Sequence, residues 1–559
     1  MAITIMRKSK AISHYSISKF SAFPLVFILS GNFAVAADIE YSASVNAELS
    51  NQEIERPASE DLSLQTFSVS HTISAFYNSK KLGASLSAQH NYLKRDNEAV
   101  ATENNFTSYS ANVRYSPIER LLTLQASSNI NYRPVNVGNF IVTDFLTNSD
   151  ELSKTQNNSV GLIFNASQGD LIRSTFNANY SDIKTDRTNA GNAGINAENL
   201  SSSLSLRNGD EVRWVRWQLN GQYQETRRDT GQYGNFTSLT ASGNSDLMLA
   251  SWFGIRFTAS TETQETSAPN SAFAIERKFN SYGAGITLTQ SPVRTLSITY
   301  NKTDSNISSS DDEDFIGGDL IWAFSNRTSV SAQYGRRFYG ESGSADITYN
   351  TKYLRSSLRY NESATNTTRL LATVDSLGVF VCPIDSQSII DCRQPDSLDY
   401  EPQAGEVLTQ FSQNIFDLND NIIIRKALNG IVGYSFSKIS YSLSLTRSED
   451  ETVETERSRI INSADLTANY TLSSKTNFNA SIRYARTKEQ LLNVDDITTE
   501  QRSTTRTFTL RINHSLSNNL NTYGSISNLD RSGQSFNAGI FGNDYTETRL
   551  SIGITYTYP

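Results

Sequence analysis

The C-terminal end of the chain reads Arg549-Leu550-Ser551-Ile552-Gly553-Ile554-Thr555-Tyr556-Thr557-Tyr558. Apolar or aromatic side chains occupy every second position from Leu550 to Tyr558, and small or polar side chains occupy the positions between them. Successive side chains of a β-strand point to opposite faces. This period of two therefore predicts a strand with one apolar and one polar face.

The same alternation recurs along the chain. It is clear at 122–132, 215–223, 466–472, 478–484 and 508–516. Short polar turns alternate with longer polar segments, among them 133–157 and 365–420. Counting these segments predicts about 24 strands arranged as hairpins, with a range of about 22 to 26 because strand boundaries are the least reliable feature of a sequence.

The composition fits a barrel in a membrane. The 559 residues are 37% hydrophobic, below the roughly 45–50% of globular chains, yet 10% are aromatic, which is too many for a disordered chain. A soluble sandwich or solenoid also alternates, but gives no reason for short and long connections to alternate. A transmembrane barrel does, because short turns lie at its periplasmic end and long loops at its extracellular end.

The sequence therefore predicts an all-β protein: a single transmembrane, antiparallel, up-and-down β-barrel in the outer membrane of a Gram-negative bacterium. Closure of the barrel is expected because hydrocarbon offers no hydrogen-bond partner to an open sheet edge. Outer-membrane lipid, lipopolysaccharide and the barrel assembly machinery are the expected partners, and no nucleic acid is.

The first 37 residues show a different pattern. Their basic residues are Arg7, Lys8, Lys10 and Lys19, and no acid precedes Asp38. An apolar run at 20–29 leads to small residues that end at Ala37, which predicts a cleaved signal peptide at 1–37 and a barrel domain at 38–559. The alternative is an N-terminal membrane anchor, for which about ten apolar residues are too few.

Groups for catalysis or metal binding are scarce. His71, His90 and His514 follow the apolar registers of their segments, so all three are expected to point outward rather than to act as general bases. We therefore expect no catalytic residues, no metal, no cofactor and no enzyme activity. Cys382 and Cys392, ten residues apart in the longest loop, are a disulfide candidate.

The inward registers carry the candidate lumen-lining residues. These are Arg114, Arg173, Arg216, Gln218, Asn220, Gln222, Arg355, Arg359, Arg483, Arg511 and Asn513. Fewer inward acids can be placed, namely Asp319, Asp465 and Glu547. A basic, amide-rich lumen would favour anionic or sugar-like solutes. The alternative is that these groups pair with one another across the lumen.

Three segments carry a family resemblance: Tyr115-Ser116-Pro117, Asn421-Ile422-Ile423-Ile424-Arg425-Lys426 and Tyr441-Ser442-Leu443-Ser444-Leu445. With the N-terminal pattern, the chain resembles the PEP-CTERM system-associated outer-membrane β-barrel proteins. The resemblance is diffuse and extends over 38–559. It implies a component encoded near exopolysaccharide and exosortase genes, and it brings no catalytic residues.

The function expected from the sequence is a passive channel or conduit for exported polysaccharide. The alternatives are a general diffusion porin and a non-conducting surface or scaffold barrel that acts through its long loops. An empty barrel of this width would leak. We therefore expect either the 365–420 loop to fold inward or a periplasmic export or plug partner to fill the lumen.

Overall fold

The computed structural model describes residues 38–57, 59–97, 100–134, 152–186, 194, 196–212, 214–228, 235–267, 275–306, 314–366, 376–383, 406–412, 422–452, 457–492, 498–534 and 543–558. The predicted signal peptide lies outside these residues. Among them, no helix is both long enough and apolar enough to cross a membrane.

The described elements are 26 strands. Their bounds are β1 (Asp38–Glu55), β2 (Leu62–Asn78), β3 (Leu82–Arg95), β4 (Glu103–Ile118), β5 (Leu122–Pro134), β6 (Leu152–Ala166), β7 (Ile172–Thr185), β8 (Asn196–Asn208), β9 (Val215–Arg228), β10 (Asn235–Met248), β11 (Phe253–Ser267), β12 (Ile275–Ser291), β13 (Arg294–Ser305), β14 (Phe315–Ser325), β15 (Thr328–Arg337), β16 (Gly340–Asn350), β17 (Leu354–Asn366), β18 (Ser376–Pro383), β19 (Glu406–Ser412), β20 (Ile422–Phe436), β21 (Ile439–Thr452), β22 (Ser458–Ser473), β23 (Thr476–Leu492), β24 (Thr498–Ser515), β25 (Leu520–Gly533) and β26 (Tyr545–Tyr558).

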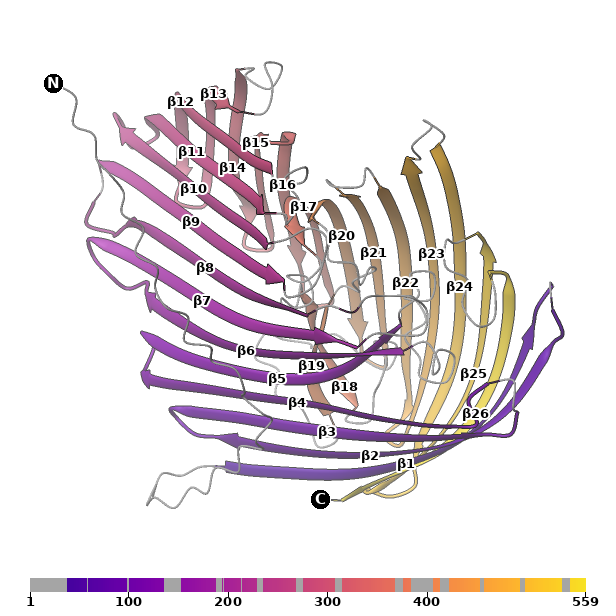
Figure 1. Cartoon of the computed structure of the whole chain (residues 1–559). Coiled ribbons are helices and arrows are strands. Elements are labelled where there is room, and N and C mark those ends of the chain that lie inside the picture. The colour runs from indigo at the N-terminus through magenta and orange to yellow at the C-terminus, as the bar shows by residue number, and fades with distance from the viewer. Residues whose placement is uncertain are drawn as a thin grey trace, which may run out of the picture. The chain divides into compact units, whose positions relative to one another are not determined.

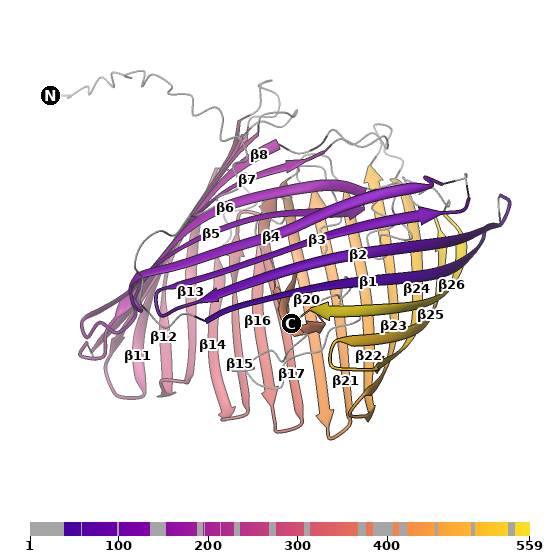
Figure 2. The same ribbon diagram turned by 90° about the horizontal axis from the view of Figure 1, so that it is seen from below.

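The wall is one 24-stranded sheet in which each strand pairs antiparallel with its neighbours in sequence. It closes where β1 pairs with β26, from Ala43 opposite Tyr558 to Glu55 opposite Thr546; Figure 2 shows the indigo β1 beside the yellow β26. The predicted barrel and its predicted strand number are confirmed.

Strands β18 and β19 were not predicted. They form a separate two-stranded sheet within the 365–420 segment, and β17 therefore pairs directly with β20. In Figure 1 this hairpin is drawn within the outline of the wall.

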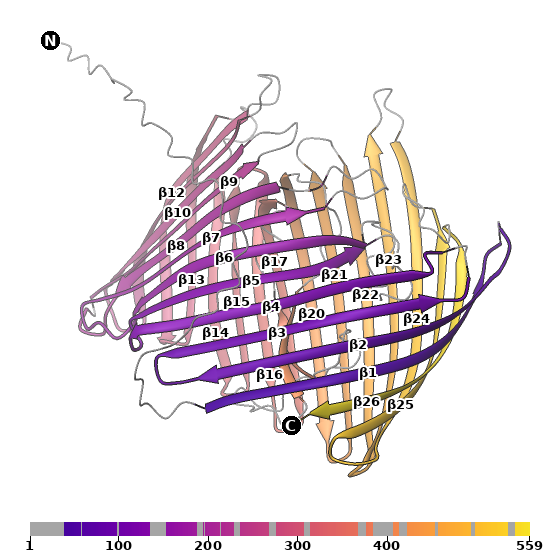
Figure 3. The same ribbon diagram turned by 60° about the horizontal axis from the view of Figure 1, so that its bottom comes forward.

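Short turns lie on one rim of the barrel and long connections lie on the other, as predicted (Figure 3). Two short turns hold non-glycine residues with positive φ, Arg120 at 64° and Ser437 at 52°. One connection on the long-loop rim is an exception. Only residues 338–339 join β15 to β16, and Gly340 follows with φ of 111°, a conformation that favours glycine.

The outer face is apolar and exposed, with Ile552 at 65% as an example. Exposed aromatic residues form two rows. Near the short turns lie Trp252, Phe324, Tyr353, Phe436 and Tyr556, and several residues further along the strands lie Tyr180, Tyr282, Tyr300, Tyr334 and Tyr484. An apolar band between two aromatic girdles is the lipid-facing surface of a transmembrane barrel. The protein is accordingly an outer-membrane β-barrel.

Candidate functional site

The three histidines lie on the outer face of the barrel. His71 lies opposite His90 in the register of β2 and β3, and both are exposed. His90 Nδ1 lies 2.8 Å from Thr107 Oγ1, and His514 Nδ1 lies 2.9 Å from Thr476 Oγ1. These positions agree with the outward orientation that the alternation predicts.

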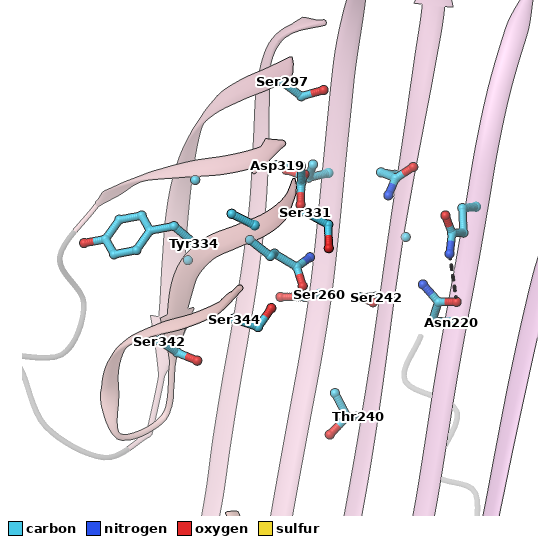
Figure 4. Close-up of a pocket in the computed structure, with 18 of the residues that line it drawn as sticks. Asn220, Thr240, Ser242, Ser260, Ser297, Asp319, Ser331, Tyr334, Ser342 and Ser344 are labelled. Atoms are coloured by element: carbon cyan, nitrogen blue, oxygen red, sulfur yellow. Dashed lines mark hydrogen bonds between the residues drawn. The ribbon is translucent and has the colours of Figure 1, made fainter. Parts of the chain in front are cut away.

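The inner face holds a cavity of about 2470 Å³, lined by strands β7 to β17 and by β20. Six of the predicted lumen residues line it: Arg173, Arg216, Gln218, Asn220, Gln222 and Arg359. Much of the remaining wall carries amides and hydroxyls, several of which are drawn in Figure 4. Gln218 Nε2 donates a hydrogen bond of 3.2 Å to Asn220 Oδ1.

The other five predicted residues do not line this cavity. Arg114 lies opposite Gln125, Arg355 opposite Gly433, and Arg483 opposite Asp465. Arg511 Nε donates a hydrogen bond of 2.9 Å to Asn513 Oδ1. Directly opposed residues share a face of the sheet, and these five alternate with exposed apolar neighbours. They therefore face the lumen but lie outside the part of the wall that lines this cavity.

Three of the predicted lumen arginines form ion pairs with acids. Arg173 pairs with Asp210, and Arg483 pairs with Asp465. Arg359 Nε lies 2.9 Å from Asp346 Oδ2. Arg216 lies opposite Asp246 in the register of β9 and β10. Arg173, Arg359 and Arg483 therefore follow the pairing alternative.

The structure places more acids on the inner face than the three that the sequence pattern could place there. Asp319, Asp465 and Glu547 are joined on the inner face by Glu48, Asp246, Glu262, Asp346, Asp450 and Glu489. The sequence pattern fails at these positions for a local reason. Met248 and Leu247 put apolar side chains on both faces of β10 beside Asp246, and the stretch 449–452 is polar on both faces of β21.

The clearest group that the sequence did not reveal is a row of alternating charges across four strands. Arg425, Asp450, Arg459 and Glu489 lie opposite one another in β20, β21, β22 and β23. Arg425 binds Asp450 through two bonds of 2.6 and 2.8 Å, and Arg459 Nε lies 2.5 Å from Glu489 Oε1. All four are buried. Neighbours in this row lie on strands that follow one another in sequence, and the register of each antiparallel pair brings them together.

A second network crosses the cavity wall. Arg256 binds Asp246 through bonds of 2.6 and 2.8 Å and binds Asp319 at 2.8 Å. Thr287 Oγ1 donates a hydrogen bond of 2.7 Å to Asp246 Oδ1. One guanidinium therefore joins acids from β10 and β14.

Within the described ranges, no group of three or more His, Cys, Asp or Glu side chains could hold a metal ion. Cys392 lies outside those ranges, and the side chain of Cys382 in β18 does too. The disulfide stays a prediction.

The sequence matches no protein-family model and no curated protein. Among solved structures, it is similar to the siderophore receptor PirA from Acinetobacter baumannii, at 10% identity and a TM-score of 0.42 over 92% of this chain and 80% of that one. It is also similar to the FrpB iron transporter from Neisseria meningitidis in its apoprotein form, at 9% identity and a TM-score of 0.45 over 93% and 81%. A mutant ferric enterobactin receptor (PfeA) from Pseudomonas aeruginosa matches at 12% identity and a TM-score of 0.36 over 92% and 80%. These likenesses transfer no ligand and no residue role to this chain.

Proposed function

We propose that this outer-membrane barrel is a passive conduit for hydroxyl-rich, uncharged solutes, with exported polysaccharide as the substrate class. The observation that carries the proposal is the cavity of about 2470 Å³, whose wall offers amides and hydroxyls while four of its arginines, Arg173, Arg256, Arg337 and Arg359, pair with acids. A wall of this kind is wet and polar without a strong field of either sign.

Amides and hydroxyls suit a sugar polymer because both groups donate and accept hydrogen bonds. Gln218, Asn220 and Gln222 lie at every second position of β9 and so present a continuous inward row along one strand. A sugar chain can exchange hydrogen bonds along such a row without a deep binding site. Passive passage needs hydrogen bonds that form and break easily as the chain moves.

A free anion would gain less from the same wall. To bind it, an arginine such as Arg359 or Arg256 must give up its carboxylate partner. Hydrogen bonds to charged groups contribute about 1.5–3 kcal/mol each, so the exchange yields little. The paired wall therefore favours neutral solutes over anions.

The resemblance to PEP-CTERM-associated barrels supports the same substrate class. The proposed partners of the barrel are an exported polysaccharide and a periplasmic export or plug protein. Polysaccharide synthesis genes beside the coding gene would support this assignment. A position among unrelated genes would count against it.

Single-channel recording in planar bilayers tests the conduit. We expect a conductance that neutral oligosaccharides reduce from either side as they enter the lumen. Asn220→Leu should weaken that effect, whereas Leu219→Ala on the outer face of the same strand should leave it unchanged. A barrel that conducts in none of its variants, or one whose current oligosaccharides do not alter, would overturn the proposal.

A further inference from the structure

The β15–β16 hairpin leaves the wall at its tip. Pairing of β14 with β15 reaches only to Gly318 opposite Tyr334, although β15 continues to Arg337. Pairing of β16 with β17 begins only at Ser344 opposite Asn361. Residues 335–343, here called the tip, are therefore paired with each other but with neither flanking strand.

The wall next to the tip turns sharply inward. Strands β11 and β13 come within 8 Å of each other across β12, although two strand spacings in a flat sheet measure about 10 Å. A Cβ on Gly285 would lie 1.9 Å from the carbonyl oxygen of Ile298, and one on Gly283 would lie 2.5 Å from that of Tyr300. Only glycine fits at these two inward positions, and Figure 1 shows the wall turning at β12 and β13.

The tip is fastened to a distant part of the wall. Arg337 Nη2 lies 2.6 Å from Glu262 Oε1, and Arg337 Nε lies 3.1 Å from Glu262 Oε2. Glu262 is on β11, four strands from β15, which is about 19 Å along a flat sheet. Extended Arg and Glu side chains together reach only roughly 11 Å by standard bond lengths. The pair can therefore form only because the wall bends at β12 and the tip leans toward β11.

Further contacts hold the tip in this position. The Arg277 guanidinium of β12 lies 6.0 Å from the centre of the Phe338 ring, and Phe338 is only 7% exposed. Gln264 Nε2 donates a hydrogen bond of 3.0 Å to Glu262 Oε1. In Figure 4 the ribbon that carries Ser342 and Ser344 curves away from the straight strands that carry Asn220 and Thr240.

We propose that the tip is the constriction of the lumen and that the Arg337–Glu262 ion pair holds it closed over the cavity. Both residues line that cavity, so the width of the passage depends on where the tip lies. The tip would admit a single extended sugar chain and exclude bulkier polymers. This inference rests on the proposed conduit function and adds the element that selects by size.

The ion pair is the place to test the inference because its acid is almost fully covered. The Glu262 side chain is 5% exposed, so a neutral replacement leaves Arg337 facing a site that water fills poorly, and the tip should detach. Glu276 of β12 offers a matched control. It is an acid near the same rim that pairs with Lys278 at 2.7 Å on the outer face and is 49% exposed.

The experiment compares wild type, Glu262→Gln, the charge swap Glu262→Arg with Arg337→Glu, and Glu276→Gln in planar bilayers. Conductance and the largest neutral polymer that enters the pore are recorded for each. We expect Glu262→Gln to raise both, the swap to return both toward wild type, and Glu276→Gln to change neither. Heat-modifiable migration on gels confirms folding, and Arg337→Met replaces Glu262→Gln should that variant fail to fold.

The outcomes separate the two proposals. A wild type that conducts, with Glu262→Gln indistinguishable from it, overturns the constriction and leaves the conduit intact. A wild type that stays closed while Glu262→Gln conducts supports a constriction that shuts the pore at rest. Silence of every variant overturns both.

Discussion

At the scale of single residues, one tyrosine adds side-chain hydrogen bonds to the backbone pairing that joins the last strand to the first. The Tyr523 side chain of β25 crosses β26 at Gly553, where an added Cβ would lie 2.2 Å from its ring. Its hydroxyl donates a hydrogen bond of 2.6 Å to Glu48 Oε2 on β1 and accepts one of 3.1 Å from Asn46 Nδ2. The Arg511 guanidinium lies 3.9 Å from the centre of the ring.

Removing this hydroxyl should loosen the seam. We expect Tyr523→Phe to destabilise the folded barrel by about 1–3 kcal/mol, because the partly buried Glu48 carboxylate loses its donor. The measurement is the temperature at which the folded band disappears in heat-modifiability gels. Tyr556→Phe, which changes an exposed tyrosine on the outer face of β26, should leave that temperature unchanged, and an equal fall in both would refute the role of the seam.

Gly553 should be equally intolerant of change. We expect Gly553→Ala to destabilise the barrel because its methyl group would overlap the Tyr523 ring, and overpacking typically costs about 1–3 kcal/mol. Combining it with Tyr523→Ala removes the overlap, so the double variant should lose less stability than the two single losses added together. Additive losses in a double-mutant cycle would show that the ring and the glycine act independently.

At the scale of strands, alternation predicts the wall well and the contacts between strands poorly. The nine-residue pattern at Leu550 to Tyr558 and its repeats are enough to predict the strands and their number, because a lipid-facing surface imposes period two on every strand. Arg256 and Asp319, by contrast, are 63 residues apart in sequence. They meet only because glycines bend the wall, and no local pattern records that bend.

The tip at 335–343 was missed for the same reason. A short connection near 341 could be read from the sequence, but its two-residue length gave no sign that the hairpin folds inward. The signal present in the sequence was the group of inward glycines at Gly283, Gly285 and Gly317. A strand that lacks side chains on its inner face can approach its neighbours more closely than one that has them.

The charged row from β20 to β23 should contribute to the strength of these strands. We expect Asp450→Asn to destabilise the barrel by about 3–5 kcal/mol, because it leaves the buried Arg425 without its carboxylate. Unfolding in urea, followed by tryptophan fluorescence, measures the loss. Asp465→Asn breaks the more exposed pair with Arg483 and should cost less, and the reverse order would contradict the argument from burial.

At the scale of the whole barrel, the ion pairs of the cavity wall should reduce the net electrostatic field that a solute meets in the lumen. This pairing predicts weak selectivity between cations and anions. The reversal potential across a salt gradient in bilayers measures that selectivity. Replacing both Asp246 and Asp319 with Asn frees the Arg256 guanidinium within the cavity wall, and we expect the reversal potential to shift toward anion selectivity. The matched control replaces Asp182 with Asn and Glu198 with Gln, which removes two acids from the outer face of β7 and β8 and should leave the potential unchanged.

Screening should weaken the shift as salt rises from about 0.1 M to 1 M, because the Debye length falls from about 10 Å to 3 Å. A wild-type pore that is already strongly anion-selective would mean that its arginines are available to solutes, and the paired wall would not then explain what the barrel conducts.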